Sequence, residues 1–132
     1  MDKVWDPLRK KEVPATAEER VRQWFIEQLR VTFGVPLHQM MTEVGFKYGG
    51  KQYRADILVY GRAAEMLAIV ECKRPDVDIS AAVAEQAMRY NMVLGVRWLI
   101  LTNGTHTYIY RKEGSAFVPH SGIPSYEDML CL

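Results

Sequence analysis

The sequence has few cysteines and no excess of charge of either sign. Its 132 residues include only two cysteines, Cys72 and Cys131, and neither belongs to a CxxC pair. A disulfide scaffold and a zinc site built on paired cysteines are therefore excluded, and reduced thiols are expected. Lys and Arg total 17 against 16 Asp and Glu, which gives a net charge of +1. This balance neither supports nor excludes a nucleic-acid partner.

Signals for secretion and membrane insertion are also missing. The amino terminus, MDKVWDPLRKKEV, is charged throughout and contains no apolar h-region. No stretch approaches the roughly 18 consecutive apolar residues of a membrane span. We therefore expect a cytoplasmic protein with no membrane partner, folded as a single domain over residues 1–132.

Capping residues, Pro and Gly divide the chain into expected elements. Residues 1–14 show no periodicity and are expected to form an N-terminal arm, while residues 119–132 form a C-terminal tail ending in a short helical turn. Two helices are expected, one beginning at Thr16 and one running from Asp78 or Ser80 to about Leu94. Strands are expected at 41–48, 53–60, 66–73, 96–101, 105–110 and 115–118, with two-residue turns at Gly49-Gly50 and, as a type I′ turn, at Asn103-Gly104. This order of helix, three-stranded meander, crossover helix, strand and strand predicts an α/β sandwich around a mixed sheet.

Two adjacent glutamates open the first helix. Thr16 and Glu19 have the spacing of a capping box, in which the Glu19 carboxylate returns to the Thr16 amide. A helical wheel places Glu18 at the centre of the apolar stripe formed by Val21, Phe25 and Leu29. The wheel and the box together favour Glu18 over Glu19 as the inward carboxylate, which then needs a cation or a donor as partner.

Three charged residues interrupt two apolar strands. Because side chains alternate along a strand, Asp56, Glu71 and Lys73 are predicted to project from one sheet face, while Ala55, Ile57 and Val59 face the other way. Cys72 then points into the opposite core and leaves its carbonyl oxygen available as a neutral ligand. Carboxylate oxygens are the ligands that Mg²⁺ prefers, and a nearby lysine can orient a water beside the ion. Such charges are costly inside apolar strands, so their presence there favours a functional role.

The order of short motifs is more specific than the three charges alone. The pieces TAEERVRQ, RADILVY, IVECKRP, EQAMRYN and LILTNGTHTY occur in sequence between about Asp6 and Pro124. In this order they resemble the PD-(D/E)XK nuclease superfamily, specifically the N-terminal nuclease domain of type I restriction enzyme R subunits. The resemblance implies a restriction-endonuclease-like α/β/α sandwich. One departure is Ala55 before Asp56, where the superfamily name has proline, but proline carries no chemistry there.

The resemblance also implies roles for individual residues. Glu18, Asp56 and Glu71 would bind the metal, expected to be Mg²⁺ or Mn²⁺, and Lys73 would be catalytic. The Cys72 carbonyl is added as a ligand by the alternation of side chains along its strand. Gln86 and Tyr90 would support the site, and their spacing of four residues puts them on one helix face. Core packing explains Tyr90 equally well.

Two arginines are weaker candidates for DNA contacts. Arg54 lies on the strand of Asp56, and Arg74 follows the strand of Glu71 and Lys73. Either could contact phosphates, and salt bridges to Glu43 or Asp76 explain them as well.

The favoured hypothesis is a Mg²⁺-dependent DNA endonuclease. The sequence lacks a GxxxxGK[ST] phosphate loop, so we expect the chain not to translocate DNA by itself. One alternative is a non-catalytic DNA-binding or assembly module that needs a partner for activity. Another is a structural subunit in which the charges form a buried salt-bridge network. DNA is the expected partner, and a second copy of the chain or a recruiting protein stays open.

Overall fold

The protein, seen here in a computed structural model, is described over residues 2–131. Its centre is a six-stranded sheet in the order β3-β4-β5-β6-β7-β8, in which only β5 and β6 are parallel neighbours. The strands are β3 (Met40–Tyr48), β4 (Lys51–Tyr60), β5 (Met66–Cys72), β6 (Trp98–Thr102), β7 (Thr107–Glu113) and β8 (Ala116–Pro119). The helices are α1 (Ala17–Val31), α2 (Ala81–Asn91) and α3 (Tyr126–Leu130), with short 3₁₀ turns at Leu37–Gln39 and Met92–Leu94.

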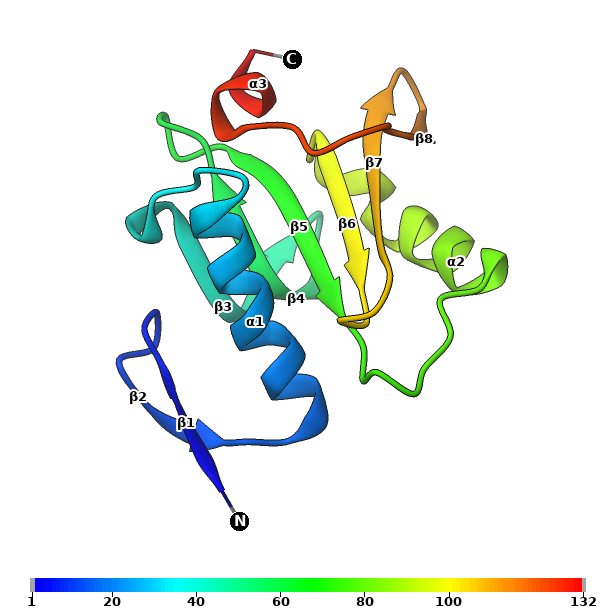
Figure 1. Cartoon of the computed structure of the whole chain (residues 1–132). Coiled ribbons are helices and arrows are strands. Elements are labelled where there is room, and N and C mark those ends of the chain that lie inside the picture. The colour runs from blue at the N-terminus through cyan, green and yellow to red at the C-terminus, as the bar shows by residue number, and fades with distance from the viewer. Residues whose placement is uncertain (1, 132) are drawn as a thin grey trace.

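Helices cover both faces of this sheet (Figure 1). Phe25, Ile26 and Leu29 of α1 pack with Ile57 and Val70 in one buried cluster. Ala84 and Ala87 of α2 pack in a second cluster with Leu58, Ile69 and Leu99. The expected α/β/α sandwich on a mixed sheet is therefore confirmed. Over residues 2–131 we found no helix that combines the length and the apolarity needed to cross a bilayer.

Local signals in the sequence explain where the two long helices begin and end. The Thr16 and Ser80 side chains cap α1 and α2, accepting hydrogen bonds from the Glu19 and Val83 amides. Gly95 ends the second helical region with a φ of +68°, which glycine adopts without a steric penalty. Because α2 lies between β5 and β6 in the chain, it crosses over the sheet and makes that pair parallel.

The segment expected to be an irregular arm is a hairpin of β1 (Lys3–Asp6) and β2 (Lys11–Pro14). The Asp6 carboxylate closes its turn by accepting from the Leu8 amide at 2.8 Å and from the Arg9 side chain. It also accepts from the Thr42 hydroxyl at 3.1 Å, which ties the hairpin to β3.

The turn between β6 and β7 also differs from the prediction. A type I′ turn needs positive φ at both central residues, but only Gly104 has it, at +87°, and Asn103 does not. The loop instead spans residues 103–106. The Asn103 side-chain oxygen organises it by accepting from the Thr105 and His106 amides at 2.9 and 2.7 Å.

Candidate active site

At Asp56, the alternation of side chains along β4 between the two sheet faces is broken. Tyr53 and Ala55 belong to the α2-side cluster, whereas Ile57 and Val59 belong to the α1-side cluster. Pairing with β3 is interrupted at this point, where Glu43 has a φ of +50°. The prediction that Ala55, Ile57 and Val59 share one face is therefore wrong, because a backbone irregularity breaks the alternation.

The strands β4 and β5 separate next to the same residue. They pair from Tyr60↔Met66 to Ile57↔Val70, and continuing this register by one position sets Asp56 across from Glu71. The Asp56 Oδ2 atom accepts from the Cys72 amide at 2.7 Å, and Oδ1 accepts from Arg22 of α1 at 3.0 Å. Asp56 thus bridges the gap between the two strands and faces α1.

Arg22 is the centre of an acidic cluster on the α1 side. It is 3% exposed, and its guanidinium lies 2.7 Å from Glu19, 2.7 Å from Glu43 and 3.3 Å from Glu18, in addition to Asp56. Burial alone lowers the pKa of Arg22, but the hydrogen bond and charge of Asp56, with Glu19 and Glu43, outweigh it and raise the pKa. Arg22 is therefore a permanent cation shared by four carboxylates.

Arg22 was not predicted from the sequence, although a signal was present. Arg22 follows Glu18 by four residues, so the wheel that puts Glu18 on the apolar stripe puts Arg22 about 40° away. A glutamate and an arginine at this spacing predict an ion pair, and the structure has it at 3.3 Å.

The burial of Glu18 and Glu19 at the start of α1 is the reverse of the prediction. Glu19 is 6% exposed, whereas the Glu18 side chain is 46% exposed. The Glu19 carboxylate accepts from Arg9 at 2.6 Å, Arg22 at 2.7 Å and Gln23 at 3.1 Å. The prediction of Glu18 as the inward carboxylate is wrong, because the N-terminal hairpin brings Arg9 onto α1 and draws Glu19 inward.

On the α2 side, four of the predicted residues line one small cavity. It has a volume of about 210 Å³ and is lined by Glu71, Lys73, Val83, Gln86, Ala87 and Tyr90. Glu71 Oε1 accepts at 3.1 Å from the side-chain amide of Asn91, which also donates to the Ala87 carbonyl at 2.8 Å. The helix-face prediction for Gln86 and Tyr90 agrees with this geometry. Asn91, fully buried at the end of α2, was not identified from the sequence.

Asp56 does not join this cavity through its side chain. Asp56 is hydrogen-bonded to Arg22 on α1, whereas Glu71 is hydrogen-bonded to Asn91 on α2. The prediction that Asp56, Glu71 and Lys73 project from a common face is therefore wrong. Within residues 2–131, no three His, Cys, Asp or Glu side chains converge as a metal site.

The other predicted residues lie at the edges of the site. Arg54 forms an ion pair with Glu43, and its amide contacts the Tyr90 hydroxyl at 3.3 Å. Arg74 lies 3.4 Å from Asp76 on the surface. Both arginines therefore have the salt bridges considered as alternatives. The Cys72 side chain is packed in the α1-side core, as predicted, and burial raises the pKa of its thiol.

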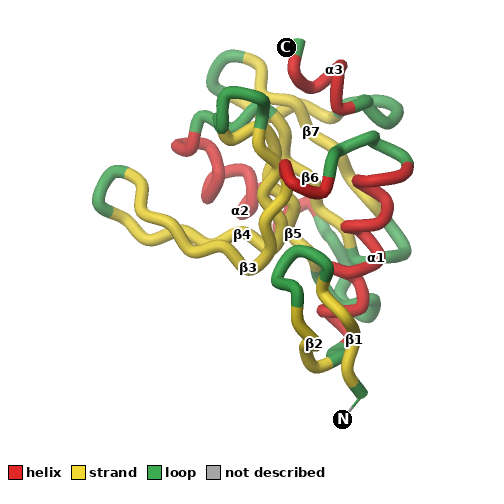
Figure 2. The backbone as a smooth tube through the Cα atoms, turned by 90° about the vertical axis from the view of Figure 1, so that its left-hand side faces the viewer, coloured by secondary structure: helices red, strands yellow, loops and turns green. Residues whose placement is uncertain are grey.

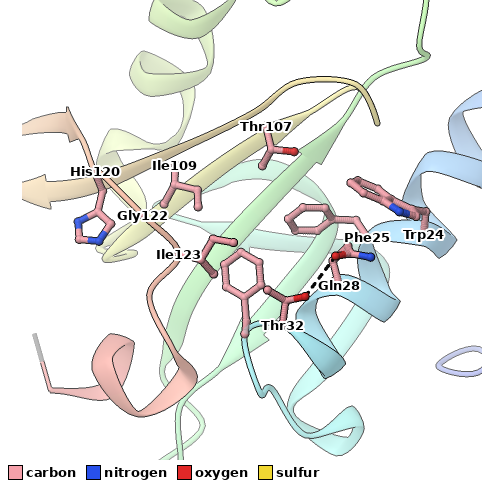
Figure 3. Close-up of a pocket in the computed structure, with 10 residues that line it drawn as sticks. Trp24, Phe25, Gln28, Thr32, Thr107, Ile109, His120, Gly122 and Ile123 are labelled. Atoms are coloured by element: carbon pink, nitrogen blue, oxygen red, sulfur yellow. Dashed lines mark hydrogen bonds between the residues drawn. The ribbon is translucent and has the colours of Figure 1, made fainter.

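A second and larger cavity lies on the α1 face, away from these charges (Figure 3). Its volume is about 350 Å³, and its lining is mainly apolar and aromatic, with Trp24, Phe25, Phe33 and Ile123 among its residues. The polar contact drawn there joins Thr32 to Gln28 at 3.2 Å. No Asp, Glu or Lys lines it, and its titratable side chain is that of His120.

Comparison with known proteins identifies the family. The family described as "Type I restriction enzyme R protein N terminus" matches residues 17–124. The chain belongs to this family. The resemblance inferred from the ordered motifs is thereby confirmed.

The fold is also similar to a crystal structure of another protein, described as a "putative nuclease belonging to DUF820" from Anabaena variabilis ATCC 29413. The two structures superpose with a TM-score of 0.53, and the two sequences are 12% identical. The similarity covers 92% of this chain and 87% of that one. At this identity it supports the fold alone. Among curated proteins, no sequence matches this chain.

Proposed function

We propose that the protein is a Mg²⁺- or Mn²⁺-dependent nuclease domain that hydrolyses phosphodiester bonds of DNA. The observation that carries the proposal is that Asp56 and Glu71 lie next to the last paired residues, Ile57 and Val70, where β4 and β5 separate. Glu71 also lines the cavity that contains Lys73. Family membership supports the same activity. The finer assignment of residues to roles rests on this geometry and on the family pattern.

The donor atoms at this point suit a hard divalent cation. Mg²⁺ in nucleic-acid enzymes is commonly held by one or two carboxylates and keeps several waters. Asp56, Glu71 and the Cys72 carbonyl would supply an oxygen-only set of this kind once the Asp56 carboxylate releases Arg22, and Glu18 is the candidate for the water shell around the ion. The bound ion would supply charge neutralisation at the scissile phosphate and a more acidic water.

The neighbouring side chains of the chain have separate tasks in this proposal. Lys73 orients the attacking water and holds a proton near the phosphate, which is the positioning work expected of an amine at such a site. Gln86 and Tyr90, on the opposite wall of the cavity, position Lys73 or a phosphate oxygen. Arg54 and Arg74 are surface arginines suited to phosphate contacts. Arg22 positions Asp56 through their 3.0 Å hydrogen bond.

The proposal is tested by incubating the purified protein with supercoiled plasmid in Mg²⁺ or Mn²⁺. Lys73→Ala should lower the cleavage rate by about 100-fold or more while leaving the thermal melt unchanged, since loss of one general acid-base group has this size. Lys11→Ala, which removes an exposed lysine from β2, is the matched control and should cut at the wild-type rate. Full activity of Lys73→Ala overturns the assignment.

One observation favours a second function, a DNA-binding or assembly module that needs a partner for cleavage. The Asp56 carboxylate is already paired with a buried arginine, so a partner that displaces this contact would be required before the carboxylate could bind an ion. For this function, wild-type protein should bind DNA in a salt-sensitive manner that neither Mg²⁺ nor Asp56→Ala changes. A second copy of the chain and a recruiting protein are the candidate partners.

A further inference from the structure

The hairpin of β3 and β4 extends well beyond the sheet. Strand β4 pairs with β5 only over Ile57–Tyr60, so residues 44–55 pair with each other and with no other strand. We call this two-stranded segment the β3–β4 arm. Figure 2 shows it projecting away from the body of the protein on the side of the sheet that carries α2.

The charge of this arm is of one sign. Residues 44–55 contain Lys47, Lys51 and Arg54 and no Asp or Glu, although the whole chain has a net charge of only +1. Lys47, Lys51 and Arg54 are exposed, and Tyr48 at the tip is 45% exposed. The turn is Gly49-Gly50, with φ values of +59° and +78° and no atom within 4 Å of where a Cβ would be. The tip is therefore narrow and positively charged.

The arm is braced against the wall of the candidate active site. The Tyr53 ring packs on the Tyr90 ring with centroids 5.0 Å apart. The Lys51 ammonium lies 5.4 and 5.6 Å from these two ring centroids, a cation–π arrangement. Tyr90 also lines the cavity that contains Glu71 and Lys73. Tyr90 therefore contacts both the arm and the cavity.

We propose that the β3–β4 arm is a duplex-DNA clamp, in which Lys47 and Lys51 contact backbone phosphates and hold the strand beside the cavity of Glu71 and Lys73. This inference deepens the proposed function and rests on it for the choice of DNA. A cationic two-stranded ribbon matches the phosphate backbone in charge, and a ribbon of this width fits the major groove. The acids nearest its base are Glu43, paired with Arg22 and Arg54, and Asp56, paired with Arg22.

The test compares two double variants that remove the same charge from different places. Lys47→Ala/Lys51→Ala removes two cations from the arm, and Lys3→Ala/Lys11→Ala removes two from exposed positions of the N-terminal hairpin. Binding to a fluorescently labelled 30-base-pair duplex is measured by anisotropy in Ca²⁺ between 50 and 200 mM salt. Each lost phosphate contact should reduce the slope of log K against log salt by about 0.9.

We expect the arm variant to bind at least about tenfold more weakly at the lowest salt, with a slope smaller by about 1.8, and the control to stay within about twofold. Lys47→Met/Lys51→Met keeps the aliphatic stems on the tyrosine rings and should lose binding equally, which separates charge from packing. An unchanged slope in the arm variants, an equal loss in the control, or no salt-sensitive duplex binding by the wild type overturns the proposal.

Failure of the clamp is distinguishable from failure of the proposed function. If the wild type binds duplex DNA through the arm but does not cut it in Mg²⁺ or Mn²⁺, the clamp stands and the self-sufficient nuclease does not. If the wild type cuts DNA in a Lys73-dependent manner and the arm variant binds and cuts equally well, only the clamp is overturned.

Discussion

The carboxylates on the two sides of the point where β4 and β5 separate have different kinds of partner. On the α1 side, Glu18, Glu19, Glu43 and Asp56 all contact one buried cation, Arg22. On the α2 side, Glu71 is hydrogen-bonded to a neutral amide, that of Asn91, and lines a cavity with Lys73. The first arrangement fixes side chains in place, and the second leaves room for a ligand.

In the proposed function, this difference would separate the residues that fix Asp56 from those that face the substrate. A buried ion network is costly to break because the most buried carboxylate, that of Glu19, then has less compensation for its lost hydration. A carboxylate held by one amide is easier to engage in a new contact. We infer that the α1 side holds Asp56 in position while the α2 side presents the groups that meet a substrate.

The largest stability effect should come from removing the shared cation. Arg22→Met removes the cation that four carboxylates share and leaves Asp56 with the Cys72 amide as its donor, so the free energy of unfolding should fall by about 3–5 kcal/mol, as when one member of a buried ion pair is deleted. Glu71→Gln on the other side should change it by less than about 1.5 kcal/mol. Urea denaturation of both variants measures the contrast, and equal losses would remove the distinction between the two sides.

A smaller effect should separate the two neighbouring glutamates of α1. Glu19→Gln weakens charged hydrogen bonds to Arg9 and Arg22 and should cost roughly 1.5–3 kcal/mol. Glu18→Gln touches a half-exposed ion pair and should cost about 0.5 kcal/mol or less. Thermal unfolding of the pair decides the point, and a larger loss in Glu18→Gln would restore Glu18 as the inward residue.

The smallest effect on stability is expected in the β1–β2 hairpin, which brings Arg9 to the carboxylates around Arg22. Burial tends to raise the pKa of Asp6, but hydrogen bonds from Arg9, the Leu8 and Arg9 amides and Thr42 lower it below its ordinary value of 3.8. A lowered pKa gives stability that is present above the ordinary value and is lost as pH falls through the folded-state pKa.

Asp6→Asn should therefore cost about 1 kcal/mol at pH 7, since the amide keeps one acceptor oxygen. The difference from the wild type should shrink below about pH 4. Denaturation at pH 7, 4 and 3 measures this trend, and a difference that stays constant across these pH values would contradict the role given to the Asp6 charge.

Several features of the site could be predicted from the sequence. The i, i+4 spacing of Gln86 and Tyr90 put both on the helix face that lines the cavity. The apolar run around Cys72 predicted its burial. The predicted orientation of Asp56 was wrong. Glu43, which lies across from Asp56 in the register, has a positive φ, and this backbone irregularity leaves no trace in the alternation of residues.

The sequence alone determined the family and the order of the main helices and of the strands of the central sheet. Caps at Thr16 and Ser80, the stop at Gly95 and the apolar runs act between residues close in the chain, so their effects can be inferred from local spacing. Only the tertiary structure decided which carboxylates meet which cation. Arg9, Arg22, Glu43 and Asp56 come from four different segments, and the strong distance dependence of charge pairing means that only their final packing selects the partners.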